Sequence, residues 1–281
     1  MSKPDATMLR TIVVPLDGSP FSATALPVAT ALAHDADAEL RAIGIARNDG
    51  EMAWTYDHVH AEARAGSPLT AADIKVVTDP NPVGLLLDLA DDPEILLCLA
   101  SHDRMPLHAK LTRSVGSEVI ERAEHPLVAV GPNANPRPLG PDVVVALDAR
   151  GDPEPLLTVA AMSARRLGCP LRIVTVYEPV PPDLRHPSHF SRMNGPGGDP
   201  DAFVSSMRER VDDIGLARID TVAVADAVGT ASGLLEHLSE RPGRLLVVGG
   251  GRKPRSPKLK VGVARHVLAA ATLPLLIVNG T

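Results

Sequence analysis

The hydrophobic residues of this chain fall into short continuous runs, separated by longer stretches in which small apolar residues recur at helical spacing. Residues 11–16, TIVVPL, form the first run, and residues 142–147, DVVVAL, form a similar run in the second half. Short runs that are apolar without alternation are typical of parallel strands covered on both faces. With helix-length segments between such runs, the pattern predicts an α/β protein.

The same order of runs occurs twice along the chain. Residues 11–46 read as strand, helix and strand, and residues 142–177 repeat that order. Each half closes with a helical segment, a proline and an apolar run, which is PLVAV at 126–130 and PLLIV at 274–278. The repeat predicts two tandem doubly wound domains, each with a five-stranded parallel sheet, helices on both faces and right-handed crossovers.

The domain boundaries follow from the repeat and from local composition. We expect the first domain over residues 1–133 and the second over residues 139–281, joined by a Pro- and Asn-containing linker at 134–138. The halves differ most after their second strands. Residues 51–66 predict a short helix, whereas residues 180–200 form a Pro- and Gly-rich insertion that predicts a loop over the strand ends.

Composition limits the functions that the chain can have. Aromatic residues make up only 2% of it, so we expect a core of Leu, Val, Ile and Ala, without the base-stacking platforms that bind single strands. A net charge of −6 and a pI near 5.9 argue against nucleic-acid binding. Cys98 and Cys169 each lie in an apolar run, which predicts two buried thiols and a reducing compartment.

No segment predicts contact with a membrane. The first ten residues lack the apolar region of a secretion signal, and no apolar run approaches the roughly 18 residues of a membrane-spanning helix. The sequence therefore predicts a soluble cytoplasmic protein.

The usual sequence patterns of catalytic sites are missing. The chain contains neither a glycine-rich P-loop with its lysine nor the G-x-S-x-G elbow of hydrolases. Ser101, His102 and Asp103 have the residue types of a catalytic triad, but triads are assembled from separate elements and adjacent residues rarely face one another. The His and Cys residues also lack metal-ligand spacing. We expect a protein that is not an enzyme and that binds no metal beyond Mg²⁺ carried by a nucleotide.

Two stretches resemble the universal stress protein family. These are VVPLDGS at 13–19 and SVGSEVIERAEHPLVAV at 114–130, and the resemblance extends over nearly the whole chain, once per half. It implies a five-stranded parallel sheet in each half and a regulatory role in the stress response through protein partners. Many members bind ATP and others do not. Members commonly dimerise, so the resemblance also implies a pseudo-dimer of the two halves or a homodimer, in which we expect the runs at 126–130 and 274–278 to pack together.

The resemblance further implies a phosphate loop with the pattern G-x-x-G-x9-G-[ST]. In the first half this pattern falls on Ala100, Asp103, Arg113 and Ser114, and only the hydroxyl of Ser114 is kept. Asp103 would place a carboxylate beside the phosphates, which repels them, although Arg113 could offset that charge. We therefore predict a degenerate loop with weak or absent ATP binding.

The second half keeps more of the loop. Gly249 and Gly262 fit the first and third glycines of the pattern, and Gly250 and Gly251 add permissive backbone positions. A second register instead makes Val261 and Gly262 the Gly-Ser pair. Five cations crowd this loop: Arg252, which replaces the second glycine, Lys253, Arg255, Lys258 and Lys260. The loop is either a solvated basic segment or an anion cradle, and the cradle makes an ATP-binding sensor the alternative function.

Two further pairs of residues complete the candidate site. Asp17 and Asp148 end the first strand of each half, where the resemblance implies a contact to adenosine and local chemistry allows a turn or helix cap. Ile45 and Val176 near the ends of the second strands would form an apolar wall for a base, or belong to the core. The candidate nucleotide-binding residues are Asp17, Ser114, Asp148, Val176, Gly249, Gly250, Gly251, Arg252 and Gly262.

Overall fold

The computed structural model describes residues 9–101, 114–135, 140–148, 152–177, 199–226, 228–250 and 263–279. The chain divides into two compact units, Met1–Pro138 and Leu139–Thr281, called unit 1 and unit 2 below and treated one at a time. Most of the expected linker and of the 180–200 insertion lies outside the described residues. The domain boundaries at 133 and 139 stay a prediction.

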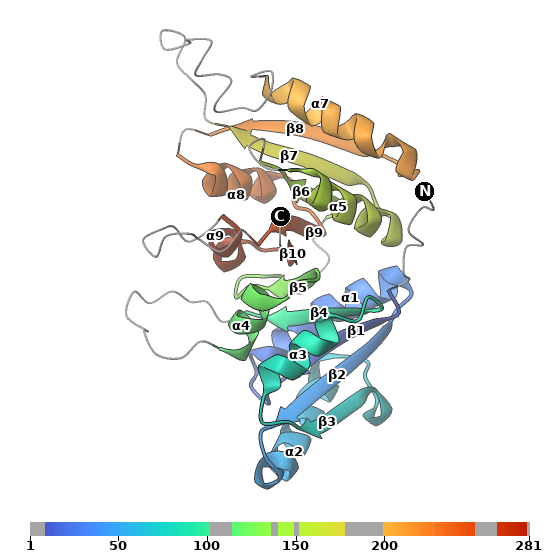
Figure 1. Ribbon diagram of the computed structural model, residues 1–281, viewed down its shortest axis with the longest axis vertical. Coiled ribbons are helices and arrows are strands. Elements are labelled where there is room, and N and C mark those ends of the chain that lie inside the picture. Colours follow the sequence, from blue (N-terminus) through green and yellow to red (C-terminus); the bar gives the residue numbers. More distant parts are fainter. Residues whose placement is uncertain are drawn as a thin grey trace. The chain divides into compact units, whose positions relative to one another are not determined.

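Unit 1 alternates strands and helices from its first strand to its last (Figure 1). Its elements are β1 (Thr11–Leu16), η1 (Ser22–Thr24), α1 (Ala25–Ala36), β2 (Glu39–Ala46), α2 (Asp49–Gly66), η2 (Ala71–Asp73), β3 (Ile74–Thr78), α3 (Pro82–Ala90), β4 (Ile95–Ala100), α4 (Val115–Arg122) and β5 (Leu127–Val130). The strands form a parallel sheet in the order β3-β2-β1-β4-β5.

Unit 2 repeats this architecture. Its elements are β6 (Val143–Ala146), α5 (Glu154–Arg166), β7 (Leu171–Tyr177), α7 (Pro200–Val211), η4 (Asp212–Ile214), β8 (Ile219–Ala225), α8 (Thr230–Glu240), β9 (Leu245–Gly249), α9 (Val263–Ala270) and β10 (Leu275–Val278). The strand order β8-β7-β6-β9-β10 is the same as in unit 1, and all neighbours are parallel. The predicted fold class is confirmed in both units.

The strand order decides where a ligand can bind. In unit 1 the chain leaves β1 toward β2 on one side, and β4 lies on the other side of β1. Helices that follow these two strands lead away in opposite directions, which opens a crevice at the carboxyl ends of the strands. The corresponding strands in unit 2 are β6 and β9. The edge formed by these carboxyl ends is called the carboxyl edge below, and the opposite one the amino edge.

The core is aliphatic, as composition predicts. Its fully buried side chains include Ile12, Leu97 and Ile173, and no aromatic residue is buried among the described ones. Neither Cys98 nor Cys169 forms a disulfide, and both are buried, which confirms the predicted burial of the two thiols. Burial raises the pKa of Cys98 to about 12, so this thiol stays protonated and inert.

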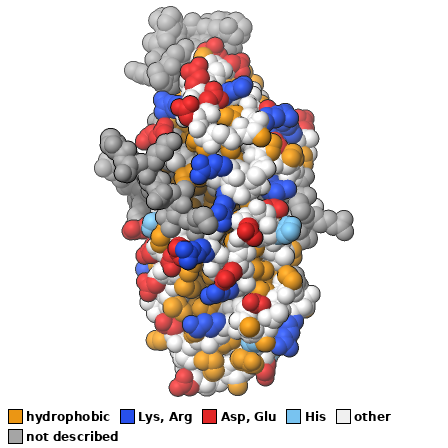
Figure 2. Space-filling model, turned by 90° about the vertical axis from the view of Figure 1, so that its right-hand side faces the viewer, with side chains coloured by type: hydrophobic (Ala, Val, Ile, Leu, Met, Phe, Trp, Pro, Cys, Tyr) orange, Lys and Arg blue, Asp and Glu red, His pale blue; other side chains and the backbone are white. Residues whose placement is uncertain are grey.

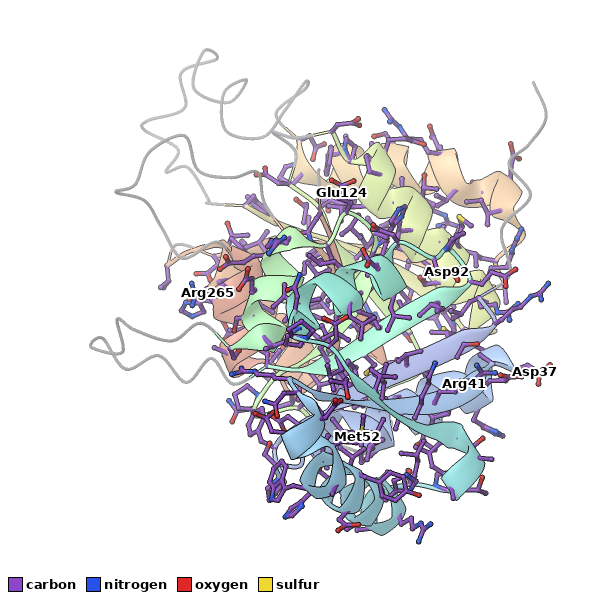
Figure 3. The ribbon with its side chains drawn as sticks, turned by 60° about the horizontal axis from the view of Figure 1, so that its bottom comes forward. Asp37, Arg41, Met52, Asp92, Glu124 and Arg265 are labelled. Carbon is purple, nitrogen blue, oxygen red and sulfur yellow. The ribbon has the colours of Figure 1, made fainter. Side chains whose placement is uncertain are left out.

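Helix α2 begins directly at the carboxyl edge of unit 1. Asn48 caps it by accepting a hydrogen bond from the backbone N–H of Glu51, at 3.2 Å, and the Glu51 carboxylate accepts from the N–H of Arg47. Figure 3 shows Met52, near the start of α2, at the opposite end of the unit 1 sheet from Asp37 and Arg41. The cap therefore places the first turns of α2 beside the strand ends.

In the part of the chain that the structure describes, no helix is both long enough and apolar enough to span a bilayer.

Candidate functional site

The turn after β1 uses the carboxylate of Asp17 locally. Asp17 Oδ1 accepts a hydrogen bond from the N–H of Ser19 at 3.0 Å, and the N–H of Asp17 donates to Ser22 Oγ at 3.2 Å. The first bond is typical of an Asx turn, one of the two local roles expected for this residue. Asp17 is exposed, and its predicted contact with adenosine stays a prediction.

Ser114 caps the last helix of unit 1. Its Oγ accepts a hydrogen bond from the N–H of Ser117 at 3.1 Å and lies 2.8 Å from Ser117 Oγ. A Cβ at Gly116 would lie 3.2 Å from the carbonyl oxygen of Ala100, so the first turn of α4 approaches the end of β4 closely. The hydroxyl kept from the family pattern is thus engaged within α4. Asp103 and Arg113 lie outside the described residues.

Helix α2 covers the Asp17 turn, a contact that sequence analysis missed. Gly18 has a φ of +80°, and a Cβ there would lie 2.9 Å from His58 Cβ and 3.2 Å from the Trp54 ring. The rings of Trp54 and His58 stack on each other with centroids 4.1 Å apart. Glycine at position 18 therefore meets two requirements, a left-handed backbone and close approach of the helix.

Glu62, also on α2, reaches the same turn. Ser22 Oγ donates a hydrogen bond to Glu62 Oε2 at 3.2 Å. Burial raises the pKa of Glu62, the Ser22 hydrogen bond lowers it, and the negative charge of Asp17 raises it further. The N–H groups of Ala23 and Gly18 also lower this pKa, so the net rise reflects burial and Asp17 together. No local motif in the sequence marks Glu62.

In unit 2, Asp148 and Gly249 follow or end neighbouring strands. Asp148 is exposed and comes directly after the stretch that carries β6. The preceding residue, Leu147, donates its N–H to the carbonyl oxygen of Val174. Gly249 is the last residue of β9, which pairs with β6. The fold thus brings these two candidates to one edge. Their contact with a nucleotide stays a prediction.

Val176 packs against helix α8. A Cβ at Gly233 of α8 would lie 2.9 Å from Val176 Cγ1 and 2.6 Å from Asp226 Cβ. Val176 is half-buried by this contact, which agrees with the core role expected as one of its two interpretations. Ile45, the corresponding residue of unit 1, is also half-buried.

Gly250 has a structural reason to be glycine. Its N–H donates to the carbonyl oxygen of Val278 at 2.8 Å, and a Cβ at this position would overlap Asn279 Oδ1. The close approach of the chain after β10 therefore requires glycine here without any ligand. The other loop candidates, Gly251, Arg252 and Gly262, lie outside the described residues, as do the four lysines and arginines between them.

A network of charged side chains lies at the amino edge of unit 2. Arg172, the second residue of β7, is fully buried, and its Nε donates to Asp142 Oδ2 at 2.9 Å. Its Nη1 donates to the carbonyl oxygen of Arg241 at 2.7 Å, and Arg241 Nη2 in turn bonds Asp220 at 2.6 Å. Arg172 is not among the residues predicted from the sequence, although one arginine within the run LRIVTVY is a signal for a buried ion pair.

His237 of α8 completes this network. Its Nε2 lies 3.4 Å from Nη1 of Arg172. Burial lowers the pKa of His237, and the charges of Arg172 and Arg241 lower it further. The neutral imidazole is therefore the form that the folded unit prefers.

The lowered pKa of His237 makes the stability of unit 2 depend on pH. As the pH falls, the unfolded chain takes up this proton first, because its pKa stays near 6.5. The contribution of His237 is therefore complete above about pH 6.5 and is lost as the pH falls below that value. We expect the melting temperature of unit 2 to decrease as the pH is lowered from about 7.5 to about 5.5. The decrease should be smaller in His237→Asn. Equal slopes in the two proteins would contradict this prediction.

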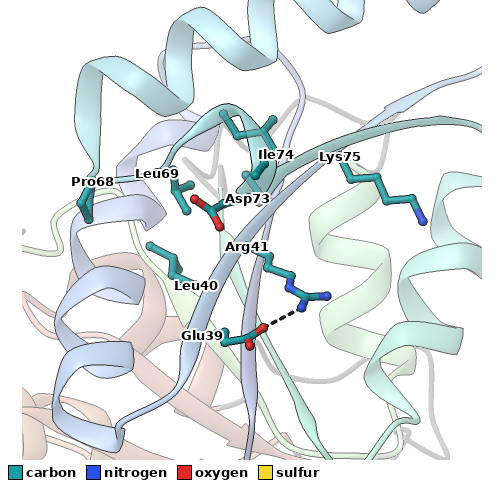
Figure 4. Close-up of a pocket in the computed structure, with 10 residues that line it drawn as sticks. Glu39, Leu40, Arg41, Pro68, Leu69, Asp73, Ile74 and Lys75 are labelled. Carbon is teal, nitrogen blue, oxygen red and sulfur yellow. Dashed lines mark hydrogen bonds and ion pairs between the residues drawn. The ribbon is translucent and has the colours of Figure 1, made fainter.

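A pocket of about 680 Å³ opens at the amino edge of unit 1, remote from the candidate residues (Figure 4). Apolar residues such as Leu69 and Ile74 line it together with charged ones, and two of these, Arg41 and Glu39, form an ion pair at 2.6 Å. On the face seen in Figure 2, positive and negative side chains are interspersed with apolar ones. Within the described ranges, no cluster of three or more His, Cys, Asp or Glu side chains is arranged to hold a metal ion.

Comparison with known proteins bears on the fold. No protein-family model matches the sequence, and no curated protein sequence is detectably similar to it. Solved structures do match over nearly the whole chain. A universal stress protein from Archaeoglobus fulgidus DSM 4304 has a TM-score of 0.64 and 15% identity, over 96% of this chain and 98% of that chain.

Two structures from Pseudomonas aeruginosa are similar as well. The first is a putative universal stress protein from strain UCBPP-PA14, with a TM-score of 0.59 and 14% identity over 97% of this chain and 94% of that chain. The second is a functionally unknown protein from strain PAO1, with a TM-score of 0.58 and 14% identity over 99% and 95%. At these identities the likeness establishes the fold.

Proposed function

We propose that this chain, which has the universal stress protein fold in each of its two units, is a tandem member of that family. Its role is that of a non-catalytic regulator in the stress response that acts through protein partners. The observation that carries this proposal is the likeness of fold to a universal stress protein over 96% of the chain. The stretches at 13–19 and 114–130 support it from the sequence side.

The proposed regulator binds ATP weakly or not at all. In unit 1 the polar groups expected to meet a nucleotide are engaged within the chain, because Asp17 bonds its own turn and Ser114 caps α4. In unit 2 the close approach of Asn279 accounts for Gly250 without a phosphate. These internal uses support degenerate binding loops in both units.

The burial of Ser101 supports the absence of catalysis. Ser101 has an exposed fraction of only 2%, and its N–H donates to the carbonyl oxygen of Val130. A buried hydroxyl at the end of β4 is a poor nucleophile for an external substrate. Release of phosphate from ATP well above the rate in buffer, abolished by substitution of one named residue, would count against a non-catalytic role.

Nucleotide binding is tested by denaturing freshly purified protein, separating any released nucleotide by chromatography, and titrating the emptied protein with Mg-ATP in a calorimeter. We expect no released nucleotide and a Kd no tighter than about 1 mM, the affinity that corresponds to about −4 kcal/mol. Arg252→Glu should then change nothing that the titration detects.

The alternative function is an ATP-binding sensor in unit 2, favoured by Asp148 and Gly249 at the ends of neighbouring strands. Binding of about one ATP per chain, lost in Arg252→Glu and kept in the matched unit 1 variant Arg113→Glu, would establish it. Loss in both variants would point to a general effect of charge.

We also propose that the two domains associate as a pseudo-dimer within one chain or as a homodimer. We expect the final strands of the two domains, at 126–130 and 274–278, to pack together within one chain or between two.

A further inference from the structure

Strand β8 is the outermost strand of the unit 2 sheet, and within the described ranges β7 is its one neighbouring strand (Figure 1). The N–H of Leu171 donates to the carbonyl oxygen of Arg218, and the N–H of Asp226 donates to that of Tyr177. Because alternate residues of a parallel strand bond the same neighbour, the even-numbered residues of β8 bond β7. The odd-numbered residues direct their backbone N–H and C=O groups away from the sheet, and these are Ile219, Thr221, Ala223 and Ala225.

This edge lacks the features that usually prevent an edge strand from pairing with another chain. The corresponding edge strand of unit 1, β3, has five residues and includes Lys75, and a lysine in an edge strand discourages pairing. β8 has seven residues, IDTVAVA, with neither lysine nor proline among them. A long and mainly apolar edge of this kind is a template for a further strand.

The charges at the two ends of β8 are opposite in sign. At the amino end, Asp220 lies between two arginines, with Arg218 Nη2 at 2.7 Å and Arg241 Nη2 at 2.6 Å from its Oδ2. Two cations against one carboxylate leave this cluster with an excess of one positive charge. At the carboxyl end stands the acidic residue Asp226, whose Oδ1 accepts a hydrogen bond from the N–H of Val228 at 2.7 Å. An antiparallel copy of β8 would therefore bring opposite charges together at both ends.

We propose that β8 pairs in the antiparallel direction with β8 of a second copy of this chain. A two-fold axis at Val222 overlaps the two strands over their whole length, Ile219–Ala225. It sets Thr221 of one copy opposite Ala223 of the other, so the outward N–H and C=O groups of each strand meet those of its partner. This interface lies at the other edge of the unit 2 sheet from β10, and it is independent of the proposed function.

The charged residues that flank β8 select this register. With the axis at Val222, Arg218 of each copy lies opposite Asp226 of the other. Moving the axis to Ala223 would instead set Asp220 opposite Asp226, where like charges repel. The full overlap of the strands and the pairing of opposite charges thus favour the same arrangement.

Sedimentation of the full-length protein over a range of concentrations tests the charge contacts. A single pair of strands buries less than a standard interface, so we expect weak, concentration-dependent dimers. Arg218→Glu and Asp226→Arg should each raise the dissociation constant by about tenfold or more, because both symmetric contacts then join like charges. An equimolar mixture of the two variants should recover association, since each contact of the mixed dimer again joins opposite charges. Arg165→Glu makes the same charge change at an exposed position of α5 and should leave the dissociation constant unchanged.

The backbone contacts are tested separately. Ala223→Pro removes an outward N–H without removing a bond to β7, so it should abolish this association while the far-UV circular dichroism is kept. Ala223→Ser keeps the N–H and should still associate. In the unmodified protein, hydrogen exchange of the amides at 219–225 should slow as the protein concentration rises, a result that does not depend on how any variant folds.

Three results would overturn the proposal. The first is a protein whose association is the same in Arg218→Glu, Asp226→Arg and Arg165→Glu. The second is a mixture of the two charge variants that associates no better than either alone. The third is exchange at 219–225 that does not change with concentration, since uniformly slow exchange would show that the chain itself covers the edge and uniformly fast exchange that nothing does.

Discussion

Replacing Arg172 by methionine is expected to lower the free energy of unfolding of unit 2 by about 3–5 kcal/mol. Arg172 is fully buried, and its guanidinium bonds the carboxylate of Asp142, whose side chain is only 4% exposed. Methionine fills much of the same volume but leaves Asp142 buried without its main partner. Arg241 Nη2 lies 3.7 Å from Asp142 Oδ2, too far for a good hydrogen bond, so it replaces Arg172 poorly.

Urea denaturation followed by far-UV circular dichroism measures this loss. Trp54 lies in unit 1, so its fluorescence identifies the unfolding of that unit and leaves the other transition to unit 2. Arg218→Met is the matched control, because Arg218 pairs with Asp220 at a side-chain exposure of 63% and should cost no more than about 1 kcal/mol.

The double variant Arg172→Met with Asp142→Leu tests the cause of the loss. Because a buried ion pair can be replaced by apolar residues at little net cost, the second substitution should restore most of the stability. An Arg172→Met protein as stable as Arg218→Met, or a double variant less stable than Arg172→Met alone, would contradict the role assigned to this pair.

Replacing Gly44 by valine is expected to cost unit 1 about 1–3 kcal/mol. A Cβ at Gly44 would lie 2.8 Å from Val59 Cγ2 and 3.3 Å from Thr55 Cγ2, and both residues belong to the buried face of α2. Gly44 pairs with Leu16 on one side and Val76 on the other, so the strand cannot move away freely. The helix must therefore shift outward, which loosens its packing.

Urea denaturation followed by Trp54 fluorescence reports this change directly, since Trp54 lies on the helix that is displaced. Gly44→Ala should cost less than valine, and its cost should shrink when Val59→Ala is added, because the two changes share one contact. Gly50→Ala is the control within α2, where the added Cβ meets only the side chain of Asn48 and alanine favours the helix. Unchanged stability of Gly44→Val would show that α2 does not press on β2.

The candidate site could be predicted only where the sequence carries a local signal. Asp17, Asp148 and Gly249 follow recognisable strand runs, and the structure places them at the expected edge. Glu62 was missed because its contact with Ser22 joins residues 40 positions apart, on two helical segments whose relative position no spacing pattern records. The use of Ser114 as a cap was open to prediction, since serine before a helix commonly caps it.

The sequence by itself determined the α/β class, the duplication and the two parallel sheets, because burial on both faces leaves unbroken apolar runs that can be read residue by residue. It also predicted the aliphatic core and the burial of both thiols. The tertiary structure alone decided what the polar groups do. Asp142 and Arg172 meet across 30 residues, and α2 covers Gly18, because the crossovers bring distant segments together. Such contacts depend on the path of the whole chain, which local periodicity does not encode.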